Sequence, residues 1–201
     1  MRKKVVYILS ITIGAAVLII GSMMLYGWLN RPLPIPLDDP NAQPIKDVLV
    51  KSHKIEHLLF CNPESDVNML DEVYKDTADY KQSSDDRVMI AKYLGKEALN
   101  GAGYLSFIKA YHLWERSGDL YPRASPDPTR EYLATVAPTP KPVRECPTPP
   151  KEPELQYQSI AIRDDKAVVI YDYAPYLTKA ILRRVDGVWF IVSSRNLAVN
   201  V

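Results

Sequence analysis

The chain has 201 residues, with 25 lysines and arginines against 24 aspartates and glutamates. Three of the basic residues precede the first long apolar run and no acidic residue does. The rest therefore carries 22 basic and 24 acidic side chains, a net charge of −2. This near-neutral balance argues against a nucleic-acid surface, which needs a basic patch or stripe. Two cysteines without a Cys-x-x-Cys pair do not make a zinc site.

Residues 5–29 form an apolar run without Asp, Glu, Lys, Arg or His. A helix crosses the hydrocarbon core with about 20 apolar residues, so the run predicts a transmembrane helix. The alternative, a cleaved signal peptide, has a shorter apolar region of about 7–15 residues, followed by small residues. Three basic residues stand before the run and only Arg31 stands close behind it. The positive-inside rule then makes residues 1–4 a cytoplasmic tail and places the C-terminal domain outside the cell membrane.

The remainder is long enough for one domain with its own core. Five prolines punctuate residues 30–44, which favours an extended, proline-rich spacer. The domain then spans residues 45–201 and contains a proline-rich insertion at 122–153, where ten of the 17 prolines lie. Such a density excludes regular helix or sheet throughout the insertion. Only residues 131–137 within it have a strand-like composition.

Helices come first along this domain. Residues 45–60 carry apolar side chains at spacings of three and four, which predicts a helix. Asn62 and Pro63 fit the cap and the first position of a second helix, which runs through residues 67–74. Further segments follow: an extended stretch at 76–80 and helices at 87–98 and 104–116.

From residue 155 onward, polar and apolar residues alternate as in strands. Asp-Gly at 186–187 suits a two-residue turn with positive φ and is the strongest hairpin signal in the chain. Two hairpins follow from the pattern, 155–163 with 166–174 and 177–185 with 188–194. They make an antiparallel sheet of four strands, or five or six if residues 76–80 and 131–137 join it. Helices followed by such a sheet predict an α+β fold.

The strand patterns at 160–169 and 180–192 resemble the final strands of nuclear transport factor 2-like (SnoaL-like) domains. Residues 70–80 resemble the helix that leads into the first strand of these domains. The resemblance implies a cone-like domain of helices packed on a curved antiparallel sheet, with an open end. The insertion at 122–153 departs from the pattern of most members.

His53, Glu56 and His57 match the His-x-x-Glu-His pattern of inverted zinc peptidases. On a helix the two histidines are close enough to share a metal ion. No further motif or third ligand accompanies them, so we expect neither a metal nor another cofactor. By helical angle the histidines flank the apolar stripe, and Glu56 turns toward it.

The resemblance also implies candidates for proton transfer, because enzymatic relatives place an Asp or His together with a Tyr inside the cone. Asp79, Tyr80 and His112 are the matching residues, and Asp76 is a further one. The alternative is that the aspartates are ordinary turn and edge residues. A pocket opening onto Asp79 or His112 would distinguish the two readings.

Cys61 and Cys146 are compatible with one disulfide outside the membrane. Such a bond would pin the proline-rich insertion to the helices. The alternative is two unrelated thiols.

A two-residue turn at 186–187 pairs Val185 with Val188 and Ile181 with Val192. Because side chains alternate between faces, Leu182, Trp189 and Ile191 are assigned to the core. The opposite face is unexpectedly apolar, which marks a contact surface. It comprises Ile181, Arg183, Val185, Val188, Phe190 and Val192. Either the insertion covers this surface, or another subunit does.

These patterns predict a single-pass membrane protein whose outer domain is a non-catalytic protein-binding or envelope-assembly module. Its partner would be another protein or a second copy. The plan is similar to that of the inner-membrane assembly proteins of type IV secretion systems, although their longer tails and Asn-Pro turn are missing. The alternatives are a small-molecule binding or isomerase/dehydratase-type domain, and a sensor or inhibitory module for a cell-wall enzyme.

Overall fold

The computed structural model describes residues 17–62, 64–118 and 153–199. The chain divides into two compact units, Met1–Leu33 and Pro34–Val201. In the first unit, residues 17–29 are helical and all of them are exposed. Among the described residues, no helix combines the length and the apolar character needed to cross a membrane. The expected cytoplasmic tail and residues 5–16 of the expected span lie outside the described ranges.

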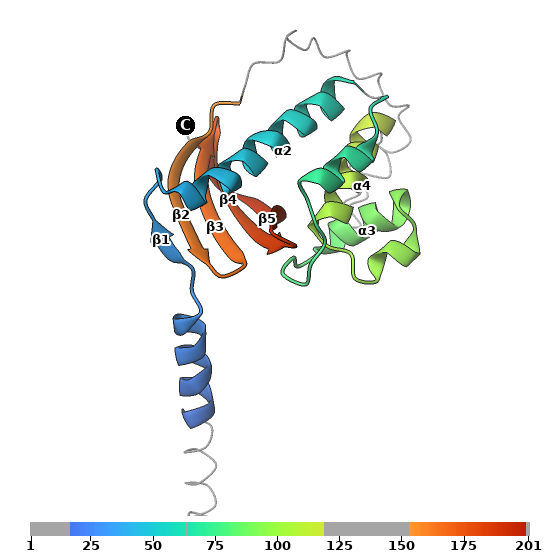
Figure 1. The fold of residues 1–201 in the computed structure, drawn as a ribbon. Helices are drawn as coiled ribbons and strands as arrows, with labels where there is room; N and C mark the ends of the chain where they lie inside the picture. Colours follow the sequence, from blue (N-terminus) through green and yellow to red (C-terminus); the bar gives the residue numbers. More distant parts are fainter. Residues whose placement is uncertain (1–16, 63, 119–152, 200–201) are drawn as a thin grey trace, which may run out of the picture. The chain divides into compact units, whose positions relative to one another are not determined.

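A five-stranded open sheet is the centre of the fold, in the order β1-β2-β3-β4-β5 (Figure 1). Its strands are β1 (Leu33–Ile35), β2 (Gln156–Arg163), β3 (Lys166–Tyr173), β4 (Tyr176–Val185) and β5 (Val188–Val199). Strands β2 to β5 are antiparallel to their neighbours. Both hairpins expected from the alternating pattern are therefore confirmed.

The turn between β4 and β5 fixes the register of that hairpin. Asp186 and Gly187 have φ of 51° and 83°, as a two-residue turn requires. Next to the turn Val185 pairs with Val188, as expected. Further along, Ile181 pairs with Ser193 instead of Val192, because a bulge inserts one residue into β5.

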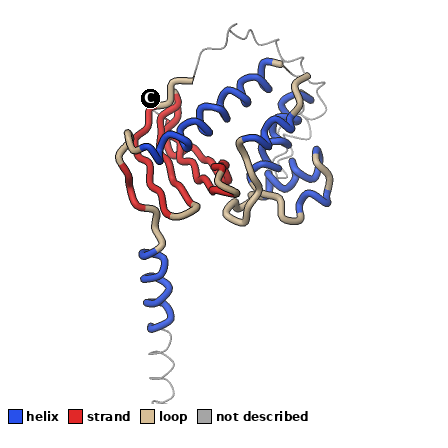
Figure 2. Tube along the Cα trace, viewed as in Figure 1, coloured by secondary structure: helices blue, strands red, loops and turns tan. Residues whose placement is uncertain are grey.

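The helical elements of this domain lie between β1 and β2 in the sequence and are drawn in blue in Figure 2. They are η1 (Pro40–Ala42), α2 (Gln43–Cys61), η2 (Val67–Glu72), α3 (Ser84–Tyr93), η3 (Lys96–Leu99) and α4 (Tyr104–Ser117). The long helix α2 crosses one face of the sheet (Figure 1). The expected helices at 45–60 and 104–116 are thus confirmed. Helix α3 begins earlier than expected, because Ser83 and Asp86 form a capping box.

Two local expectations are wrong. Asn62 does not cap a second helix, because η2 is a short 3-10 helix capped by Asp66. Residues 76–80 do not form a strand, and the isolated bridge nearby joins Tyr74 to Ile191. Within the expected spacer, residues 33–35 form the strand β1, and Ala42 is fully buried. The fifth strand is therefore β1, while residues 131–137 lie outside the described ranges.

The main core lies between α2 and the sheet. Helix α2 contributes a buried stripe of Ile45, Leu49, Ser52, Ile55 and Leu59. Leu182, Trp189 and Ile191 face it from the sheet, as the alternation predicts. A smaller cluster of Met89, Ile90 and Ala110 joins α3 to α4. The domain is therefore an α+β fold with helices packed on one face of an antiparallel sheet.

Helix α4 is capped from a distant loop. Gly103 precedes the helix and has no side chain to cap it. Instead the carboxylate of Asp76 accepts hydrogen bonds from the amide of Ser106, at 3.1 Å, and from its hydroxyl. This contact leaves no room at Gly103, where a Cβ would lie 2.8 Å from the Cα of Asp76. Gly103 therefore lets the 76–77 segment sit against the start of α4.

We expect Gly103→Ala to lower the free energy of unfolding by about 1–3 kcal/mol, the usual cost of overpacking, as measured by urea denaturation. Gly101→Asn is the matched control. No atom lies within 4 Å of a Cβ at that position, and Asn tolerates its φ of 76°. Equal costs for the two variants would contradict the close approach of Asp76.

Candidate functional site

The sheet face opposite α2 carries the surface expected from the sequence. Ile181, Arg183, Val185 and Phe190 are partly buried there, and Val188 is 52% exposed. Val192 does not belong to this surface, because it is fully buried. The bulge beside it explains the difference, since an extra residue re-aims the side chains that follow. The outer surface is therefore defined as these five residues without Val192.

A segment of the same chain covers part of this outer surface. The amide of Lys75 donates to the carbonyl of Ile191 at 3.1 Å, and the Lys75 ammonium lies 5.2 Å from the centre of the Phe190 ring. Further on, Asp79 reaches Arg183. The two covers anticipated from the sequence were the insertion and another subunit. The structure adds a third cover, the segment of residues 75–79, and Val188 stays exposed to solvent.

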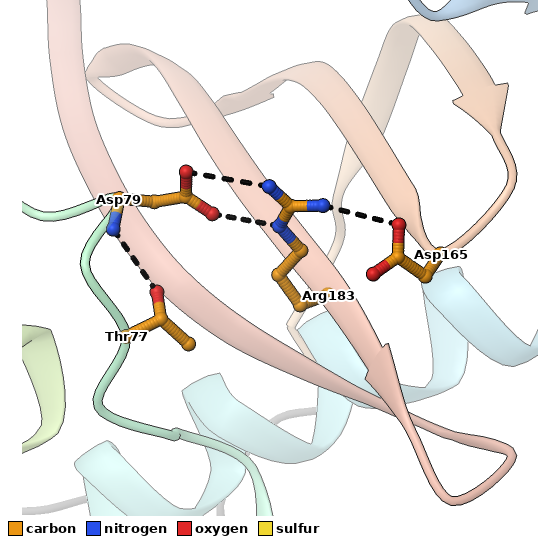
Figure 3. A network of polar contacts seen from close by, with 4 residues as sticks. All are labelled: Thr77, Asp79, Asp165 and Arg183. Carbon is orange, nitrogen blue, oxygen red and sulfur yellow. Dashed lines mark hydrogen bonds and ion pairs between the residues drawn. The ribbon is translucent and has the colours of Figure 1, made fainter.

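Arg183 is the polar centre of this contact (Figure 3). Its Nε donates to Asp79 at 2.7 Å and its Nη1 donates to Asp165 at 3.1 Å. The hydrogen bond from Arg183 lowers the pKa of Asp79 below its usual range, and the same bond raises the pKa of Arg183. Thr77 accepts from the amide of Asp79 at 3.3 Å. Asp79 is thus an anchor for its segment and stays ionised.

The three catalytic candidates have different partners. Asp79 is paired with Arg183 on the outer surface, so it does not point into the interior as expected. The hydroxyl of Tyr80 donates to Asp86 at 2.5 Å. His112 is buried on α4, 3.8 Å from Glu115, and burial lowers its pKa to about 4. The three residues thus bind different partners: Arg183, Asp86 and Glu115.

An interior cluster around Glu56 was missed as a site by the sequence reasoning. The Tyr74 hydroxyl donates to the Glu56 carboxylate, and Ser52 hydrogen-bonds Tyr74. Burial raises the pKa of Glu56 to about 7, and the charge of Glu115 adds to this. The signal was the helical angle that turns Glu56 toward the apolar stripe. Its tyrosine partner lies on another element, which no local pattern indicates.

Two more tyrosines extend this cluster toward the sheet. Tyr104 and Tyr171 both hydrogen-bond Ser194. His53 lies 3.1 Å from the Tyr171 hydroxyl, and its ring centre lies 4.3 Å from that of Tyr173. Burial lowers the pKa of His53 to about 4. The cluster therefore holds a neutral imidazole and an acid that is half protonated near pH 7.

The histidine pair is not assembled as a metal site. His53 contacts Tyr171, whereas His57 lies 3.5 Å from the sulfur of Cys61. In the part of the chain that the structure describes, no three His, Cys, Asp or Glu side chains gather as metal ligands. Cys146 lies outside the described residues, so a disulfide between Cys61 and Cys146 stays a prediction.

Comparison of the chain with protein-family models, curated proteins and solved structures finds no match. What the chain does is inferred below from its own side chains. Two features carry chemistry: the partly open outer surface of β4 and β5, and the interior cluster around Glu56.

Proposed function

We propose that this chain is a membrane-anchored, non-catalytic protein whose α+β domain binds a protein partner through the outer face of its sheet. The observation that carries the proposal is a row of apolar side chains across that face. Ala161, Val168 and Ile181 form one apolar row across three strands, and Phe190 pairs with Arg183 in the neighbouring row. A sheet face in contact with water shows polar residues instead. Contiguous apolar patches of this kind mark interaction sites.

The anchor rests on a second observation. Residues 17–29 form a helix without a charged side chain, and its large apolar residues are exposed, from Leu29 at 48% to Leu18 at 73%. Exposed apolar helices are stable in a lipid environment. Together with the charge-free residues 5–16, the helix supports a transmembrane anchor with the domain on the extracytoplasmic side.

The family relation is part of the same proposal. Helices packed on one face of an antiparallel sheet are compatible with a nuclear transport factor 2-like cone. Envelope-assembly proteins combine such a domain with one membrane span, which favours an assembly role.

We expect Phe190→Asp to disperse the complex formed in native membranes, because a carboxylate at the centre of an apolar interface is desolvated without a partner. Sizing of the detergent-solubilised complex measures the effect. Phe190 is partly buried, so Val188→Asp is a second variant at an open position. Val88→Asp on α3 is the control, since Val88 is 44% exposed away from the sheet. An unchanged complex in both sheet variants would exclude this face as the interface.

A second candidate function is a small-molecule binding or isomerase/dehydratase-type domain. The hydrogen bond from Tyr74 to Glu56 favours it, because an acid with a pKa of about 7 suits proton transfer near neutral pH. Small carbonyl compounds should then raise the melting temperature of the wild type but not that of Glu56→Gln. Equal melting temperatures with and without the compounds would remove this alternative.

A further inference from the structure

Two rows of cations cross the outer face of the sheet. In the first row Arg163 pairs with Lys166, and Lys166 pairs with Arg183. In the second row Lys179 lies directly opposite Arg195. Like charges at directly opposed positions of a sheet repel each other and reduce its stability. A nearby anion would offset the repulsion in each row.

The first row has its anions within the chain. Asp79 and Asp165 both bind Arg183, and the charge of Lys166 acts on Asp79 as well. Asp79 comes from the 75–79 segment, which lies on the sheet without being a strand of it. The first row thus shows how this face binds a peptide segment. The carboxylate of Asp79 pairs with Arg183, directly beside the apolar ring of Phe190.

The second row has no such anion among the described residues. Lys179 is partly buried and Arg195 is exposed, and neither makes an ion pair there. The nearest acidic position in the register is Asp172, which pairs with Leu177, diagonally from Lys179. Its carboxylate already accepts a hydrogen bond of 2.7 Å from Gln158. Apolar Ile170 pairs with Lys179, and Leu197, two residues after Arg195, is 42% exposed.

We infer that the protein partner of the outer face carries a carboxylate that pairs with Lys179 and Arg195, within a segment that also has apolar side chains. The inference rests on the proposed function and names the chemistry of its partner. Charge complementarity argues for this occupant, because the two cations lie beside apolar Ile170 and Leu197, and an apolar segment with a carboxylate matches both features. A second copy of this chain is the other occupant that the test distinguishes.

Zero-length carbodiimide coupling in native membranes tests this inference on the full chain. The reagent joins a lysine amine to a carboxylate in direct contact. We expect one adduct between Lys179 and an acidic peptide of another protein, identified by mass spectrometry. Lys179→Arg keeps the charge but has no amine to couple, so the adduct should disappear while the complex remains. The pair Lys51–Glu72, at 2.6 Å, is an internal positive control for the reaction.

Arg195→Glu separates binding from folding. The new carboxylate would lie opposite Lys179 and neutralise it within the chain, so the melting temperature should not fall. The adduct and the yield of complex should decrease at least tenfold. Lys96→Glu, at an exposed position on η3, is the matched control and should change neither.

A photo-crosslinker at Val188 reports on the proposed interface independently. Capture of a partner at Val188 without a Lys179 adduct would overturn the inference and leave the proposed function standing. The absence of both would overturn the proposed function as well. An adduct of Lys179 only with Asp172 or with a second copy of this chain would also overturn the inference.

Discussion

We expect Leu182→Ala to lower the free energy of unfolding by about 2–5 kcal/mol, the range for truncating a buried leucine. Leu182 is fully buried on β4, where it pairs with Ala167 on β3 and Ile191 on β5. Its removal leaves a cavity between α2 and the sheet, and the paired strands on both sides restrict relaxation. Urea denaturation followed by far-ultraviolet circular dichroism measures the loss.

Val188→Ala is the control in the same hairpin. Val188 is 52% exposed, so its truncation should change the free energy of unfolding by about 0.5 kcal/mol or less. A loss below about 1 kcal/mol for Leu182→Ala would mean that the inner face of β4 is not the core. A large loss for Val188→Ala together with a small loss for Leu182→Ala would mean that the inner and outer faces of the sheet are reversed.

The hairpins could be predicted because their signals are local. An alternating pattern determines the faces of a strand, and Asp-Gly determines the turn and therefore the register beside it. The prediction fails at Val192, five residues after Gly187, because nothing in the local pattern marks the bulge. The bulge lies next to Ile191, which forms a bridge to Tyr74 from a distant part of the chain.

The positions of the loops depend on contacts between residues far apart in the chain. Residues 76–80 have an extended composition, yet Asp76 binds Ser106 and Asp79 binds Arg183 instead of joining the sheet. Residues 33–35 contain a proline, which suggests a spacer, but an edge strand tolerates a missing amide. The positions of these segments are determined by tertiary contacts, which leave no periodic pattern in the sequence.

The candidate sites also differ in whether local sequence patterns or tertiary contacts determine them. Five residues of the outer surface were predicted from alternation alone. The interior cluster was not, because Glu56 becomes significant only when Tyr74 packs beside it. The family resemblance suggested Asp79, Tyr80 and His112 as one catalytic group. In the structure each of them contacts a different residue, which the resemblance did not predict.

The pH dependence of stability tests the interior. Burial lowers the pKa of His53 and His112 from 6.5 to about 4. Between these pH values the unfolded chain binds more protons than the folded domain, so both histidines reduce stability as the pH falls. Glu56 acts in the opposite direction. Its pKa is raised from 4.5 to about 7, so its burial is least unfavourable at the acidic end of that range.

The effect of the two histidines exceeds that of Glu56, so we expect the wild type to lose about 2 kcal/mol of unfolding free energy between pH 6.5 and pH 4.5. The pKa of Asp79 is lowered, so its contribution is lost only below this window. Glu56→Gln removes the opposing proton and should roughly double the slope. The double variant His53→Gln, His112→Gln should reverse its sign, with stability rising on acidification. Urea denaturation at each pH measures all three slopes. A flat profile that none of these changes affects would mean that Glu56 and the two histidines are in contact with water, because only buried groups couple protonation to folding in this way.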